Sequence, residues 1–323
     1  DVMSLMQVSD YLTWLAEVVI EHTVNISWKH MTDQYGQPQG ADGKVPGFIV
    51  VGYGKVGGIE LGYKSDLDLV FLYNGSAAQN SLVKSSPGKT CTTGPRVIDN
   101  STFFARLGQR IIHILSTATP SGTAYEIDMR LRPSGNSGML VSSLAAFEKY
   151  QREDAWTWEH QALVRARVVA GDKKVAQAFD ITRKSILEQY RCAQSLRTEV
   201  VEMRTKMRKH LGRATKDGKF SLKQGIGGIV DIEFMVQFAV LAWSHNHPEL
   251  TRWSDNIRIL ESLAQSELLS EQQTSQLITV YKRYRSAGHL LQLQNQLPEV
   301  ADNELVECRE IVTDQWQQLF ENQ

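Results

Sequence analysis

The most informative part of the sequence is residues 48–73, FIVVGYGKVGGIELGYKSDLDLVFLY. The run FIVV at 48–51 is short, apolar and ended by a glycine, which predicts a buried strand. The run DLDLVFLY at 66–73 predicts a second strand, and a glycine-rich turn separates the two. Glycines in such a turn let the backbone approach a phosphate group closely. The turn and the acidic strand are therefore candidates for one binding site.

The glycine turn fits two interpretations. Gly52, Gly54 and Gly57 spell GxGxxG, the fingerprint of dinucleotide-binding folds. That fold needs a crossover of a dozen or more residues before the next, parallel strand. Here the next strand begins at Asp66, eight residues after Gly58, so the dinucleotide-binding interpretation is rejected.

The second interpretation is a metal and nucleotide site. Asp66 and Asp68 are two residues apart on a strand, so their carboxylates share one face while Leu67 and Leu69 share the other. Two carboxylates suit Mg²⁺, which prefers oxygen ligands and keeps phosphate as a co-ligand. The alternative is a pair of ordinary surface acids at the start of a strand. Ser65 either contacts a phosphate or begins the strand.

A third carboxylate is expected from residues 124–131, AYEIDMRL, whose strict alternation predicts a third strand. Its polar face carries Glu126, Asp128, Arg130 and Arg132. Asp128 would complete a site for metal ions, and the arginines would bind anionic oxygens nearby. Arg130, Arg132 and Lys55 are therefore candidate partners of a triphosphate, with surface salt bridges as the alternative.

The remaining pattern predicts an α+β chain with a small mixed sheet followed by an all-helical bundle. Before residue 170 we expect a helix at 2–28, loops at 33–47 and 74–100, a helix at 101–117 and one or two helices over 143–169. After it we expect no strand, and helices at about 174–190, 197–211, 229–245, 255–266, 271–296 and 303–321. The predicted domains are 1–170, catalytic, and 171–323, helical.

Composition narrows the class of protein. The 323 residues suit one large domain or two ordinary ones, and 42% hydrophobic residues support a packed core. A net charge of −1 argues against non-specific nucleic-acid binding. Three distant cysteines disfavour a disulfide scaffold or a cysteine zinc site and predict a cytoplasmic protein. Neither a membrane span nor a signal peptide is expected, and the start at Asp1 suggests a fragment of a longer protein.

Several other side chains allow two interpretations, an ordinary structural position and a role at the functional site. Glu60 is expected at the surface, with a supporting role beside the site as the alternative. Trp156 and Trp158 are expected in the core, where tryptophans usually pack, with framing an adenine as the alternative. Asp231 and Glu233 begin a predicted helix, where the helix dipole favours acids, so a structural role is expected.

The spacing of these motifs resembles a known superfamily. Gly54, Lys55 and the DLDL of 66–69 are similar to the polymerase-beta-type nucleotidyltransferases, in which a glycine turn precedes a DxD strand. Lys55 stands where that pattern usually has glycine or serine, so Gly57 and Gly58 are the candidates for that role. Five longer motifs resemble the glutamine synthetase adenylyltransferase family and cover nearly the whole chain. They are GYGKVGGIELGYKSDLDLVFLY, YEIDMRLRPSGNSGML, AWTWEHQALVRARVV, GGIVDIEF and TRWSDNIRILE.

The resemblance implies a polymerase-beta-like catalytic domain and transfer of AMP from ATP to a tyrosine of glutamine synthetase. It further implies that Asp66, Asp68 and Asp128 bind catalytic Mg²⁺, that the chain is the C-terminal, adenylylating part of a two-activity enzyme, and that glutamine and the PII signal protein regulate the intact enzyme. Two alternatives stay open. One is phosphorolytic removal of AMP, and the other is a catalytically silent docking module for glutamine synthetase or PII.

Overall fold

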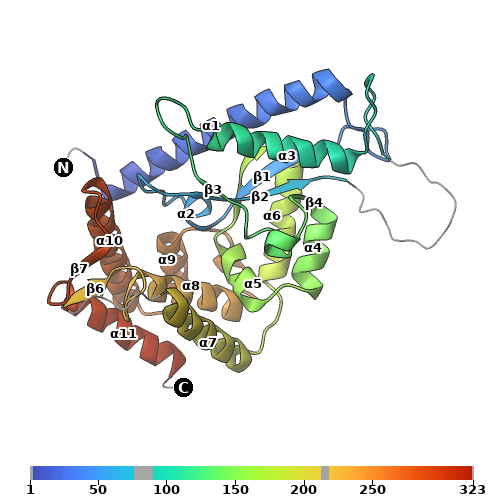
Figure 1. Ribbon diagram of the computed structural model, residues 1–323. Helices are drawn as coiled ribbons and strands as arrows, with labels where there is room; N and C mark the ends of the chain where they lie inside the picture. Colours follow the sequence, from blue (N-terminus) through green and yellow to red (C-terminus); the bar gives the residue numbers. More distant parts are fainter. Residues whose placement is uncertain (1–2, 76–89, 212–217, 322–323) are drawn as a thin grey trace.

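Figure 1 shows the computed structural model, which describes residues 3–75, 90–211 and 218–321. Up to residue 171 the chain contains both helices and strands. They are α1 (Leu5–Tyr35), β1 (Phe48–Gly52), α2 (Gly54–Gly57), β2 (Leu67–Tyr73), α3 (Asn100–Ser116), β3 (Ile127–Asp128), β4 (Val141–Ser143), α4 (Leu144–Glu153), α5 (Thr157–Val164) and β5 (Arg167–Gly171).

Helices dominate the rest of the chain. They are α6 (Lys173–Leu187), α7 (Ala193–Leu211), α8 (Ile229–Trp243), α9 (Asn256–Gln265), α10 (Glu271–Leu293) and α11 (Val306–Phe320), joined by the short strands β6 (Lys219–Ser221) and β7 (Glu299–Ala301). None of the helices within the described ranges combines the length and the apolar character needed to cross a bilayer. The mixed α and β content agrees with the predicted fold class.

The main sheet has the order β3-β2-β1-β5, and β4 also pairs with β2. β1 and β2 are antiparallel, with Gly52 opposite Leu69, so the glycine turn closes a hairpin and not a parallel crossover. β3 and β4 run parallel to β2, which confirms the small mixed sheet. The antiparallel pairing also confirms the rejection of a dinucleotide-binding fold.

Both faces of the sheet are covered, as Figure 1 shows. Val50, Leu69 and Phe71 belong to a hydrophobic cluster with α1 and α3. Val70 and Leu72, which point the other way, belong to a larger cluster that includes residues of α4, α6 and the helices α7–α11. The core is therefore continuous across residue 171. A boundary at 170/171 would fall inside β5, and the division into two domains stays a prediction.

The predicted helices after residue 171 are confirmed to within four residues at each end. α1 ends seven residues later than predicted, and the loop predicted from residue 33 therefore begins later. The reason is tertiary packing: Trp28 contacts the rings of Phe103 and Phe104 on α3, and the Tyr35 hydroxyl accepts a hydrogen bond of 2.6 Å from Arg106. Of the loop predicted at 74–100, residues 76–89 lie outside the described part of the chain.

Several short strands contradict the predictions. Residues 167–169, expected to be helical, begin β5, because Val168 and its neighbours complete the sheet beside β1. β4 was not predicted either. The part after residue 171 is not all-helical, since β6 and β7 form an antiparallel pair. Strands of three to five residues between long helices are too short to show a period of two in the sequence.

The third predicted strand is much shorter than expected, with only Ile127 and Asp128 paired. The backbone N–H of Arg130 donates to the Asp128 carboxylate at 2.8 Å, and that of Arg132 donates to the carbonyl of Met129 at 3.3 Å. The chain therefore turns directly after Asp128. Arg130 and Arg132 lie in this turn and do not continue the strand.

Replacing Gly57 tests how closely the glycine turn is packed. A Cβ at Gly57 would overlap the backbone carbonyl oxygen of Arg165, whereas Gly288 on α10 has open space around it. We expect Gly57→Ala to lower the free energy of unfolding by roughly 3 kcal/mol or more. Gly288→Ala should raise it by about 1 kcal/mol, because alanine favours a helix. Urea unfolding followed by circular dichroism measures both, and equal stability of the two variants would contradict the close packing.

Candidate active site

The three predicted carboxylates lie together at one end of β2. Asp66 directly precedes β2, Asp68 is its second residue, and Asp128 on β3 pairs with Asp68 in the parallel register. One carboxylate oxygen from each residue lies within 4.8 Å of the other two. Because side chains alternate along β2, Asp68 points to the same face as Val70 and Leu72, toward the C-terminal helices.

The electrostatics of the cluster are those of crowded negative charge. Burial, followed by the charges of Asp66 and Asp128, raises the pKa of Asp68 to about 6. Hydrogen bonds from Arg130 instead lower the pKa of Asp128, and the guanidinium Nε lies 2.8 Å from Oδ2 and 3.0 Å from Oδ1. Asp128 thus stays ionised, while Asp68 is held in a place where its charge is costly.

A divalent cation fits this donor set. All three side chains offer only oxygen, the ligand that Mg²⁺ prefers, and their mutual repulsion is the interaction that a bound cation relieves. Asp66, Asp68 and Asp128 are therefore the residues that would hold Mg²⁺. Asp66 is exposed, whereas Asp68 and Asp128 are half-buried. The site therefore opens to solvent on the side of Asp66.

The glycine turn lies directly beside Asp68. Gly54 has φ +54°, in the left-handed region, and a Cβ there would stand 2.6 Å from the Asp68 Oδ2. Two conditions, the backbone conformation and the nearby carboxylate, therefore require glycine at this position. Gly57 and Gly58 lie in the same turn, against Arg165. The first amides of α2 have no acceptor within the helix, as at any helix start, and they lie beside the acidic cluster.

Two lysines bring positive charge to the carboxylates. Lys55, on α2, is half-buried, and burial followed by the charge of Lys223 lowers its pKa. Lys223 lies in the turn between β6 and α8, and its charge opposes the raised pKa of Asp68. Sequence reasoning missed Lys223, because more than 150 residues separate it from the DxD strand. The only signal was its place just before the glycines of GGIVDIEF.

Contrary to the expectation of a surface position, Glu60 is buried, with an exposure of 3%. Its carboxylate pairs with Arg165 and accepts a hydrogen bond of 2.6 Å from Tyr281, and its backbone N–H donates to the carbonyl of Lys55 at 2.8 Å. Arg165 also binds Glu233 on α8 at 2.7 Å. Burial, the largest single influence, would raise the pKa of Glu60, but the charges of Arg165 and Arg285 and the hydrogen bonds from Tyr281 and Asn256 together outweigh it and lower the pKa. These contacts join the glycine turn to the C-terminal helices.

The other predicted residues are differently placed. The Arg132 guanidinium donates to backbone carbonyls of its own turn, at 2.7 Å to Met129 and 3.2 Å to Asn136. The Ser65 hydroxyl accepts from the backbone N–H of Gly62 at 2.9 Å and closes a turn. Arg130 is exposed and held by Asp128. Asp231 is buried and binds Arg204 and Arg208 at 2.6 and 2.7 Å, in agreement with a structural role.

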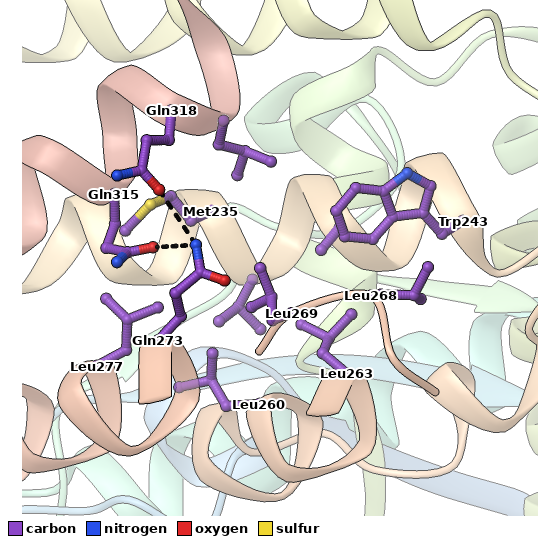
Figure 2. Close-up of a pocket in the computed structure, with 13 residues that line it drawn as sticks. Met235, Trp243, Leu260, Leu263, Leu268, Leu269, Gln273, Leu277, Gln315 and Gln318 are labelled. Carbon is purple, nitrogen blue, oxygen red and sulfur yellow. Dashed lines mark hydrogen bonds between the residues drawn. The ribbon is translucent and has the colours of Figure 1, made fainter. Parts of the chain in front are cut away.

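Two cavities differ in the chemistry of their lining residues. One of about 410 Å³ adjoins the acidic cluster and is lined by residues 61–66, 124–126 and Leu12. The other, of about 240 Å³, lies between α8, α9, α10 and α11. Figure 2 shows its apolar lining and the amide of Gln273, which donates to Gln315 and Gln318 at 3.1 Å each. The second cavity has no ionisable lining residue, whereas the first is bordered by Asp66 of the acidic cluster.

Comparison with known proteins now decides the family. Residues 1–182 match the family model described as glutamate-ammonia ligase adenylyltransferase. The chain belongs to this family. Residues 201–301 match a second model, described as GlnD PII-uridylyltransferase.

Individual relatives cover the whole chain. Proteins named bifunctional glutamine synthetase adenylyltransferase/adenylyl-removing enzyme are 50% identical in Pseudomonas putida, over 98% of this chain, and 49% identical in Nitrosococcus oceani, over 100% of it. The protein of that name from Vibrio parahaemolyticus is 49% identical over 99% of the chain. The chain spans about a third of the length of these relatives.

The raised pKa of Asp68 predicts how stability depends on pH in magnesium-free buffer. A carboxyl with a pKa near 3.9 unfolded and about 6 folded holds its proton more tightly when folded, so stability falls as pH rises from 4 to 6. We expect Asp68→Asn to remove this fall and to stabilise the protein by about 2 kcal/mol at pH 7. Thermal and urea unfolding at several pH values would measure it.

Asp128→Asn is the matched control for this experiment. The pKa of Asp128 is lowered, so its contribution has the opposite sign: it is present above the unfolded pKa and is lost as pH falls through the folded one. The variant should therefore lose stability at neutral pH. The same pH profile for both variants would show that the two carboxylates do not differ as the structure indicates.

Proposed function

We propose that this chain transfers AMP from ATP to a tyrosine hydroxyl of glutamine synthetase and releases pyrophosphate. The observation that carries the proposal is the convergence of Asp66, Asp68 and Asp128 beside a glycine turn, in a chain of the adenylyltransferase family. The names of the relatives supply the protein substrate. We further propose a polymerase-beta-like catalytic domain over 1–170 with a helical domain over 171–323, and regulation of the larger enzyme by PII and glutamine.

The chemistry assigned to each residue follows from its position. The tyrosine hydroxyl releases its proton to solvent, its oxygen forms a bond to the α-phosphorus of ATP, the bond from that phosphorus to the oxygen that bridges to the β-phosphate breaks, and pyrophosphate leaves with the electron pair. Asp66, Asp68 and Asp128 would hold magnesium, which when bound would neutralise the triphosphate charge and lower the pKa of a tyrosine hydroxyl, near 10 in water. Lys55, Lys223 and the amides of the glycine turn bind phosphate oxygens and orient the chain of phosphates.

The remaining contacts support this arrangement. Arg130 keeps Asp128 ionised through its hydrogen bonds, so that Asp128 serves as a ligand. The buried pairing of Glu60 with Arg165 holds the backbone at Lys55 in place. The cavity that borders Asp66 gives the adenosine or the incoming tyrosine access to the carboxylates. Nucleotidyl transfer depends mainly on such positioning and on electrostatics.

Replacing one carboxylate should abolish the reaction. We expect Asp68→Asn to lower AMP transfer from labelled ATP to unmodified glutamine synthetase by roughly a thousandfold or more, because a ligand and its charge are lost together. Asp33→Asn, which removes an exposed carboxylate paired with Lys29, should transfer AMP at the unaltered rate. Transfer by Asp68→Asn at that same rate would contradict the site.

The same chain discriminates between the open alternatives. It should label unmodified glutamine synthetase with ATP, and it should not release label from modified glutamine synthetase with phosphate. Release without transfer would favour the adenylyl-removing reaction. Calorimetry with ATP and magnesium should give a metal-dependent heat of binding, and its absence would favour a docking module.

The two lysines predict a shared effect on nucleotide affinity. Lys55→Met and Lys223→Met should each weaken binding of magnesium-ATP by roughly tenfold, because each removes a charge-assisted hydrogen bond to phosphate. Lys29→Met, on the outer face of α1, should not change it. Calorimetric titration measures all three variants, and unchanged affinity of Lys223→Met would remove Lys223 from the site.

A further inference from the structure

A groove away from the carboxylates lies between the α4–α5 turn and α7, two segments that Figure 1 shows close together. Its volume is about 540 Å³. Residues 153–158 form one wall, and Glu199, Glu202, Met203 and Lys206 form the other, from one face of α7. The function proposed above uses none of these side chains.

Two tryptophans of this groove contradict the expectation that they pack in the core. Trp156 is 71% exposed and Trp158 is 37% exposed. Large aromatic side chains that face water side by side are unusual on a monomer surface and are typical of recognition sites. An indole face attracts a cation, and it does so more strongly than other aromatic rings.

The charge of the groove is negative. Glu153, Asp154, Glu199 and Glu202 line it, against the single ammonium of Lys206. The Lys206 ammonium lies 3.8 Å from the Glu202 carboxylate. Both side chains are exposed, so this ion pair is weak. Among the described residues, the Asp154 carboxylate has no ion-pair or hydrogen-bond partner. The groove therefore presents acceptors and negative charge to whatever enters it.

Gln161 adds an independent sign of a missing donor. Its side chain is 3% exposed and lines the groove. The amide nitrogen donates to Gln237 at 3.2 Å, while the amide oxygen has no hydrogen-bond partner. A buried acceptor without a donor is destabilising, so a ligand that donates to it would recover the lost free energy.

We propose that this groove binds an arginine-bearing segment of a partner protein. A guanidinium is planar, so it stacks on the indole of Trp156 or Trp158, and its five N–H groups supply donors to the carboxylates and to the Gln161 oxygen. A lysine ammonium has the charge but neither the plane nor the fork of donors. The groove is also larger than one side chain, which suits a peptide and not a lone ion.

The test uses the 323-residue chain and three blocked peptides with two arginines, two lysines or two glutamates between glycines. Calorimetry should show binding of the arginine peptide, weaker binding of the lysine peptide by about fivefold, and no binding of the glutamate peptide. Trp156→Ala and Asp154→Asn should each weaken the arginine peptide by about fivefold. Indole N–H signals in NMR spectra should shift on addition of the arginine peptide, and Trp156→Ala identifies one of them.

Two control variants test whether a change in peptide binding is specific to the groove. Trp14→Ala removes an exposed tryptophan of α1, and Glu310→Gln removes an exposed acid of α11, and neither should alter peptide binding. Equal binding of the arginine and glutamate peptides, or unchanged binding by Trp156→Ala and Asp154→Asn together, would overturn the proposal. Tighter binding of spermine than of the arginine peptide would also overturn it, since the groove would then select a small polycation. AMP transfer is measured separately, so its loss or presence does not affect this test.

Discussion

The alternation of side chains along β2 links the hydrophobic core to the acidic site. Leu69 and Phe71 fill the cluster under α1 and α3, and this orientation sends Asp68 to the opposite face. There it meets Asp128 across a parallel strand pair and Gly54 from the glycine turn. A slip of one residue in register would bury the carboxylate among phenylalanines and expose the leucines, so core packing and site geometry are stabilised by the same contacts.

The charged groups around the site come from segments that are far apart in the sequence. Lys55 follows β1, whereas Lys223 and Glu233 lie near the start of α8. Arg165 joins these parts, because its guanidinium is buried between Glu60 and Glu233. Such a pair is expensive to desolvate, and loss of one partner would leave the other buried and uncompensated. The contact therefore fixes the glycine turn relative to the C-terminal helices more than it adds to stability.

The strongest local patterns in the sequence were sufficient to predict the central strands and helices of the fold. The strands predicted from the apolar runs at 48–51 and 66–73, the main helices predicted from the period of 3.6, and the shared face of Asp66 and Asp68 are present as predicted. β5, β6 and β7 were missed because their pairing depends on distant strands. Burial of Glu60 and the role of Lys223 depend on tertiary contacts that no local pattern encodes. Trp156 was misplaced because side-chain preference describes an average, and a recognition surface departs from it.

The position of β5 in the chain has a consequence for how the protein folds. β1 is flanked by β2, which follows within a short hairpin, and by β5, which the ribosome delivers more than 110 residues later. Until residue 171 has emerged, one edge of the most buried strand lacks its hydrogen-bonding partner and is open to pairing with other chains. Contacts of such long sequence separation also slow folding. Closure of the sheet thus lags synthesis of β1, and during that interval the β1 edge of the nascent chain is exposed.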